Sequence, residues 1–172
     1  ARGVTPDQEA VAARLRFAGI ELNLPAIARA ACAGVTSLPG LTILPFLGHD
    51  ARRKLERLAP EAIALPSGRS ARLLYRDDGT VSAAVKLQEL FGLADSPRIG
   101  AGAERVIFEL LAPNGRPVQL TRDLKSFWSR TYPEVRKELR ARYPKHPWPE
   151  DPWTAAPTAR SGGAGRPGRA GR

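Results

Sequence analysis

The sequence predicts an α+β fold, in which a small five-stranded β barrel lies between helical flanks and a proline-rich strap. Apolar residues recur at helical spacing near both ends, short alternating runs fill the middle, and prolines crowd residues 144–152. Neither a helix nor a central strand tolerates that many prolines. These patterns divide the chain into a helical linker segment at 1–58, a barrel at 59–122, C-terminal helices with the strap at 123–157, and a disordered basic tail at 158–172.

Three short helices are expected in the first 58 residues, over residues 7–18, 26–33 and 51–58. In the first, Val11, Leu15 and Ala18 share one face. Asp50 is the expected N-cap of the third. The cations of that third helix form either a solvated face or a binding surface; they are Arg52, Arg53, Lys54 and Arg57.

Five strands are expected from Pro60 onward, and Asp-Gly and Asn-Gly pairs at 78–79 and 114–115 signal hairpin turns. A helical run over 87–93 separates the third strand from the fourth. This connectivity is that of an OB-like barrel. The apolar residues that mark the strands are Ile63 and Leu65; Leu73 and Tyr75; Val81, Ala83, Val85 and Leu87; Val106, Phe108 and Leu110; and Val118 and Leu120.

The positive charge of the chain favours a polyanionic partner. Lys and Arg number 27 against 17 acidic residues, which gives a net charge of +10, and each neutralised phosphate releases counterions. Solubility alone is the other explanation of such a charge. An OB fold binds oligonucleotides on its second and third strands and on two loops. The cations expected there contact phosphate or are ordinary exposed residues; they are Arg69, Arg72, Arg76, Lys86 and Arg116.

A capped basic helix and the strap follow the predicted barrel. Asp123 is the expected N-cap of a first helix, and Thr131 with Glu134 forms a capping box for a second. The cations of the second helix are candidates for phosphate contact: Arg136, Lys137, Arg140 and Arg142. Trp128, Tyr143 and Trp148 are the expected structural anchors of the strap, as core residues or as interface residues.

Several classes of site are not expected. One cysteine and two histidines rule out an internal disulfide and argue against a zinc site. The dipeptide Gly-Lys never occurs, so the sequence has no Walker A loop. No apolar run approaches the roughly 20 residues that span a bilayer. The chain is therefore predicted to have no catalytic residues, no metal and no activity by itself. Because it contains no methionine, we expect a fragment or a processed piece of a longer protein.

Three stretches together resemble the C-terminal region of the HrpB family, bacterial ATP-dependent helicases of the DEAH-box class. They are Lys86–Ile99, Leu110–Leu124 and Phe127–Pro152. The resemblance implies an accessory domain on the nucleic-acid path of a cytoplasmic helicase, without the motor domains that use ATP and Mg. It also implies two partners, single-stranded nucleic acid (RNA being the expected kind) and those motor domains, and no membrane. The alternative is a structural or docking domain that packs on the motor and binds no nucleic acid.

Overall fold

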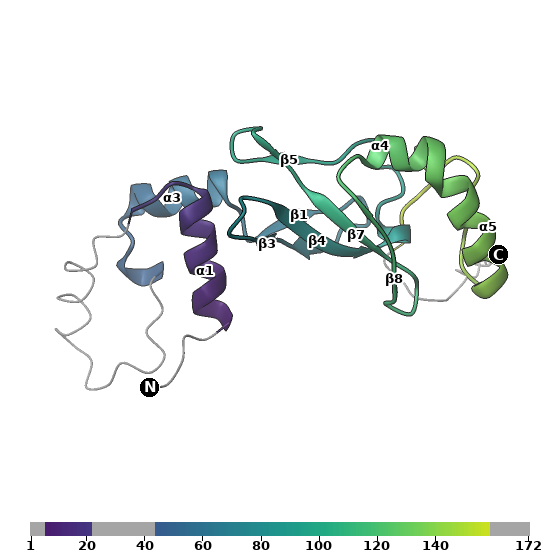
Figure 1. Ribbon diagram of the computed structural model, residues 1–172, viewed down its shortest axis with the longest axis horizontal. Coiled ribbons are helices and arrows are strands. Elements are labelled where there is room, and N and C mark those ends of the chain that lie inside the picture. Colours follow the sequence, from purple (N-terminus) through teal and green to yellow (C-terminus); the bar gives the residue numbers. More distant parts are fainter. Residues whose placement is uncertain (1–5, 22–43, 159–172) are drawn as a thin grey trace, which may run out of the picture. The chain divides into compact units, whose positions relative to one another are not determined.

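The computed structural model describes residues 6–21 and 44–158 and contains both helices and strands (Figure 1). The described residues form two compact units. The first unit takes in residues 6–21, 44–63, 72–83 and 97–106, and the second takes in 64–71, 84–96 and 107–158. The predicted helix over 26–33, Cys32 within it, and the predicted tail lie outside the described residues, apart from Thr158.

The first unit contains the N-terminal helices, α1 (Pro6–Phe17), η1 (Leu44–Phe46) and α3 (His49–Leu58). The predicted helices over 7–18 and 51–58 are confirmed. The predicted cap of the helix over 51–58 is wrong, because Gly48 occupies the N-cap position and Asp50 lies inside the first turn. Leu15 and Leu55 bring α1 and α3 together at the centre of an apolar cluster.

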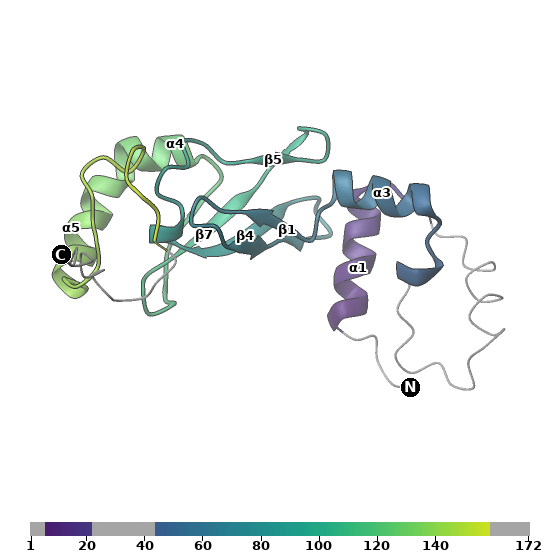
Figure 2. The ribbon, with the colours of Figure 1, turned by 180° about the vertical axis from the view of Figure 1, so that it is seen from behind.

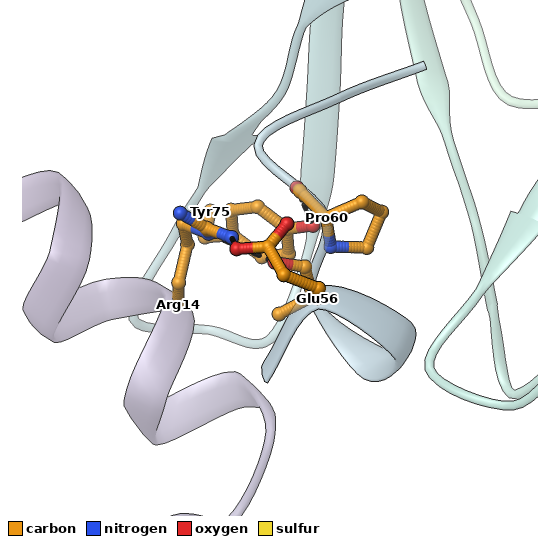
Figure 3. A network of polar contacts seen from close by, with 5 residues as sticks. Arg14, Glu56, Pro60 and Tyr75 are labelled. Carbon is orange, nitrogen blue, oxygen red and sulfur yellow. Dashed lines mark hydrogen bonds and ion pairs between the residues drawn. The ribbon is translucent and has the colours of Figure 1, made fainter. Parts of the chain in front are cut away.

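A buried arginine ties α1 to the end of α3 (Figure 3). Arg14 is only 4% exposed; its Nε donates to the Ala59 carbonyl at 2.8 Å, and its Nη2 donates to Glu56 Oε1 at 2.7 Å. The Tyr75 hydroxyl donates to the Pro60 carbonyl at 2.6 Å, and burial raises the pKa of Tyr75. Carbonyls at a helix C-terminus lack intrahelical donors, so these side chains satisfy the backbone where α3 ends.

Within the described residues, eight short strands form three separate sheets. The orders are β1-β2, β3-β4-β7-β8 and β5-β6. The strands are β1 (Ala62–Ala64), β2 (Ser70–Arg72), β3 (Leu74–Tyr75), β4 (Val81–Lys86), β5 (Arg98–Ile99), β6 (Glu104–Arg105), β7 (Ile107–Leu111) and β8 (Pro117–Thr121). The predicted run over 87–93 is helical only at η2 (Leu87–Glu89).

The predicted OB-like barrel is not confirmed, because no closed barrel forms within the residues that the structure describes. The expected second strand breaks at Leu73, whose N–H donates to the Glu61 carbonyl. The chain therefore pairs with β1 before Leu73 and with β4 after it. A barrel requires every strand to have two neighbours, whereas β3 and β8 are the outer strands of their sheet.

One helical run with three parts follows β8 in the second unit: α4 (Leu124–Ser126), the π-helical turn η3 (Phe127–Thr131) and α5 (Tyr132–Arg142). The Asp123 cap is confirmed, since its Oδ1 accepts from the Ser126 N–H at 2.9 Å. The capping box at Thr131 is wrong, since the run has already begun at Leu124 and the Thr131 side chain makes no cap hydrogen bond. Glu134 pairs with Lys137 instead.

The strap returns alongside α5 in both ribbon views (Figures 1 and 2). The Tyr132 hydroxyl donates to the Pro149 carbonyl at 2.8 Å, and Arg136 Nε donates to the Trp148 carbonyl at 2.8 Å. The Trp148 indole N–H donates to the Tyr143 carbonyl at 2.9 Å. At the C-terminal end of the strap, the backbone N–H of Gly92 donates to the Pro152 carbonyl.

Aromatic rings fill the core beneath the helical run. Trp128 is 1% exposed, and its indole N–H donates to the Leu93 carbonyl at 2.8 Å. Its ring lies edge-on to Tyr132 at 5.3 Å and within 6.0 Å of Phe91, measured between ring centroids. Burial of such large rings makes a strong contribution to the stability of a core.

Candidate nucleic-acid interface

Two of the cations predicted on the barrel, Arg69 and Arg72, have acidic partners. Arg69 Nη1 lies 3.2 Å from Glu89 Oε1, and the Glu89 side chain is only 9% exposed. In the first unit, Arg72 Nη2 lies 3.5 Å from an Asp7 carboxylate oxygen. The backbone thus brings a carboxylate to each guanidinium from a distant part of the chain.

The cations of α5 are similarly occupied. Arg136 is 19% exposed, and besides its bond to the strap its Nη2 lies 3.0 Å from Glu150 Oε1. Lys137 pairs with Glu134 at 2.9 Å, one turn away. Arg142 pairs with Glu138 at 3.8 Å. Arg136 therefore supports the strap, while the other two belong to ordinary pairs along the helix surface.

Three of the predicted phosphate contacts make no ion pair with any residue that the structure describes: Lys86, Arg116 and Arg140. Arg116 and Arg140 are exposed, and Lys86 is half-buried. Arg76 is exposed as well, with Nη2 lying 3.5 Å from the Ser82 hydroxyl. Phosphate contact by these residues stays a prediction.

The pairing lowers the attraction that the surface can exert on a polyanion. An exposed ion pair contributes only about 0–1 kcal/mol to stability, so the pairs do not lock the side chains in place. Each carboxylate nevertheless cancels the local charge of its partner, and a phosphate would have to displace it. The number of counterions released on binding, and with it the salt dependence, falls accordingly.

The chain matches a family described as ATP-dependent helicase C-terminal (HrpB_C) over residues 32–152. It is also 41% identical over 135 residues to the ATP-dependent RNA helicase HrpB of Escherichia coli K12. The aligned region covers 74% of this chain and 17% of that protein. The chain belongs to this family.

Two solved structures of the E. coli protein share the fold. The structure described as the DExH-box NTPase HrpB aligns with 91% of this chain and 22% of its own, at 32% identity and a TM-score of 0.80. The one described as the DEAH/RHA helicase HrpB aligns with 84% of this chain and 21% of its own, at 31% identity and a TM-score of 0.64. The chain thus spans about a fifth of these HrpB chains and corresponds to their C-terminal domain.

Residues 6–21 and 44–158 contain no group of three His, Cys, Asp or Glu side chains placed to hold a metal ion, and none of their helices has the length and apolar character of a membrane span. His146 packs between Tyr143 and Trp148, with ring centroids 6.3 and 6.5 Å away. Asp78 and Asp151 are turn residues, and hydrogen bonds from Thr80 and Thr154 lower their pKa values.

Sequence reasoning missed one exposed surface of the HrpB-type domain. Leu120, on the outer strand β8, is 63% exposed. The neighbouring strand β7 reads Ile-Phe-Glu-Leu-Leu, apolar at positions that point to both faces of the sheet. Strands with apolar residues on both faces are typical of sheets covered on both sides. That pattern was the signal in the sequence for apolar residues on the second face of the sheet.

Proposed function

We propose that this chain is the docking domain at the C-terminal end of an HrpB-type helicase, and that it packs on the rest of the helicase. The observation that supports this role over phosphate contact is the pairing of five of the eight predicted contacts with carboxylates of the same chain: Arg69, Arg72, Arg136, Lys137 and Arg142. In this proposal, the binding of ATP and Mg and the cytoplasmic location are properties of the whole helicase.

The strap supports the same role. Its recognisable residues, Trp148 above all, make their hydrogen bonds inside the domain. A strap fixed in this way is already ordered within the second unit, and an ordered surface docks with little loss of conformational entropy.

The docking role can be tested in the full-length helicase with a protease site inserted before this domain. After cleavage, we expect the domain to co-elute with the remainder in size-exclusion chromatography, in the absence of RNA and nucleotide. A domain that elutes alone at micromolar concentration would show that it does not dock. A helicase without the protease site, treated in the same way, is the control for damage by the protease.

Nucleic-acid contact is the second candidate, favoured by the three cations without a described ion pair. Three phosphate contacts would give the logarithm of the affinity for single-stranded RNA a slope of about −2 against the logarithm of salt concentration. The triple variant K86Q/R116Q/R140Q should abolish that slope, whereas K137Q, at a paired lysine, should change it little. Fluorescence anisotropy with a short labelled RNA across a salt series measures both, and we expect negligible binding near 0.15 M salt (roughly physiological).

A further inference from the structure

The part of the four-stranded sheet that lies in the second unit, residues 84–86 with β7 and β8, has one closed face and one open face. Val85, Phe108 and Leu110 are 3%, 0% and 0% exposed. The residues that alternate with them within the second unit point to the opposite face: Ala84 is exposed, and Lys86, Ile107, Glu109 and Leu111 are half-buried. Ser82, earlier in β4, is buried. Glu109 lies directly opposite Leu120 of β8 in the strand register, so Leu120 shares that open face. We call this surface the outer sheet face: Ala84, Lys86, Ile107, Glu109, Leu111 and Leu120.

The outer sheet face is unusually apolar for a surface in water. A sheet with one solvated face normally alternates apolar and polar residues, but Ile107 and Leu111 are half-buried aliphatic residues there, and Leu120 is 63% exposed. Only Lys86 and Glu109 carry charge on it, one of each sign, and neither makes an ion pair within the described part of the chain.

The edge of the sheet adds backbone groups to the same surface. The strand β8 is outermost, so its outward N–H and C=O groups have no strand partner among the described residues. Proline and a register irregularity are common protections of a free edge. Both occur here, at Pro117 and between Leu110 and Leu111, which leaves the end of β8 that carries Leu120 without such protection.

We propose that the outer sheet face is the surface on which the rest of an HrpB-type helicase docks; this inference depends on the docking function proposed above. The occupant is argued from the length of chain that lies outside this structure, since the chain spans only 17% of the E. coli relative and 22% of its solved chain. The docked surface should be apolar, with a carboxylate to meet Lys86 and a cation to meet Glu109.

Amide hydrogen exchange in the isolated chain and in the full-length helicase tests this assignment. Amides of residues 107–121 should exchange about tenfold or more slowly in the full-length helicase, because docking covers β8. If no peptide of this domain gains protection, the docking function itself fails. If other peptides gain protection and 107–121 do not, the docking function stands and the outer sheet face is the wrong surface.

Two variants make the test specific to the surface. In the full-length helicase, L120E should return the exchange of residues 107–121 to the rate in the isolated chain, whereas W153S, at an indole that is 39% exposed on the strap, should not. Circular dichroism of both isolated variants checks that they fold. Unchanged protection in L120E would overturn the proposal. Protection in the isolated chain that grows with its concentration would also overturn it, by assigning the face to a second copy.

Discussion

The strap with α5 and the outer sheet face belong to the same unit but differ in which side chains they bury and which they expose. In the strap region, residues typical of recognition are used by the fold: Arg136 and Tyr132 hold strap carbonyls, and Trp148 is 7% exposed. On the sheet, plain aliphatic side chains such as Leu120 are left in water. The difference teaches that the strap's tryptophan, prolines and nearby arginine serve the internal packing of this unit, while the surface proposed for docking consists mainly of aliphatic residues.

The largest expected effect would come from removing the strap's indole. Trp148→Ala should lower the free energy of unfolding by about 3–5 kcal/mol, because a buried ring and its hydrogen bond are lost. Urea denaturation followed by circular dichroism measures this. The matched control is Trp153→Ala, at the more exposed indole, which should cost less than about 1 kcal/mol. Equal losses in the two variants would mean that Trp148 does not hold the strap.

A second effect should appear in the first unit, where a buried arginine also serves the fold. Arg14→Ala should lower the free energy of unfolding by about 1–3 kcal/mol, because the buried Ala59 carbonyl loses its donor. Glu56→Gln should cost less than about 1 kcal/mol, since the Glu56 side chain is 57% exposed. Chemical denaturation of both variants gives the comparison. A larger loss for Glu56→Gln would contradict the role assigned to the carbonyl bond.

A smaller effect is expected from alkaline pH. Burial raises the pKa of Tyr132 from its ordinary value of 10.0 to about 12, while Arg136 nearby opposes the shift. A tyrosine with a raised pKa stabilises the fold fully below its unfolded pKa, and that contribution is lost as the pH rises through the folded value. Stability should therefore fall between about pH 10 and pH 12, and Tyr132→Phe should make the fall shallower. Thermal unfolding across this range tests it; identical pH profiles would refute the assignment to Tyr132.

Local patterns predicted much of the secondary structure. Helical spacing gave α1 and α3, and alternation gave strands at β1, β4, β7 and β8. Two-residue strands such as β5 and β6 are too short to show alternation, so the sequence could not indicate them. The barrel failed at Leu73, where a bond to the distant Glu61 carbonyl decides which sheet the chain joins.

The candidate site was harder to predict for the same reason. A list of cations says nothing about their neighbours in space: Glu89 reaches Arg69, and Glu150 reaches Arg136, from other parts of the chain. The pairs within α5 were visible in the sequence, since Lys137 and Arg142 each have a glutamate one turn earlier. The only sign of the outer sheet face in the sequence was the apolar run of β7.

The most direct test of the account is co-elution of the cleaved domain with the remainder of the helicase, compared between the wild type and L120E. Leu120 is exposed, so L120E should change the stability of the isolated domain by less than about 0.5 kcal/mol. The account predicts that the wild-type domain remains bound after cleavage and that the folded L120E domain is released. An L120E domain that stays bound as tightly as the wild type would contradict docking through the outer sheet face.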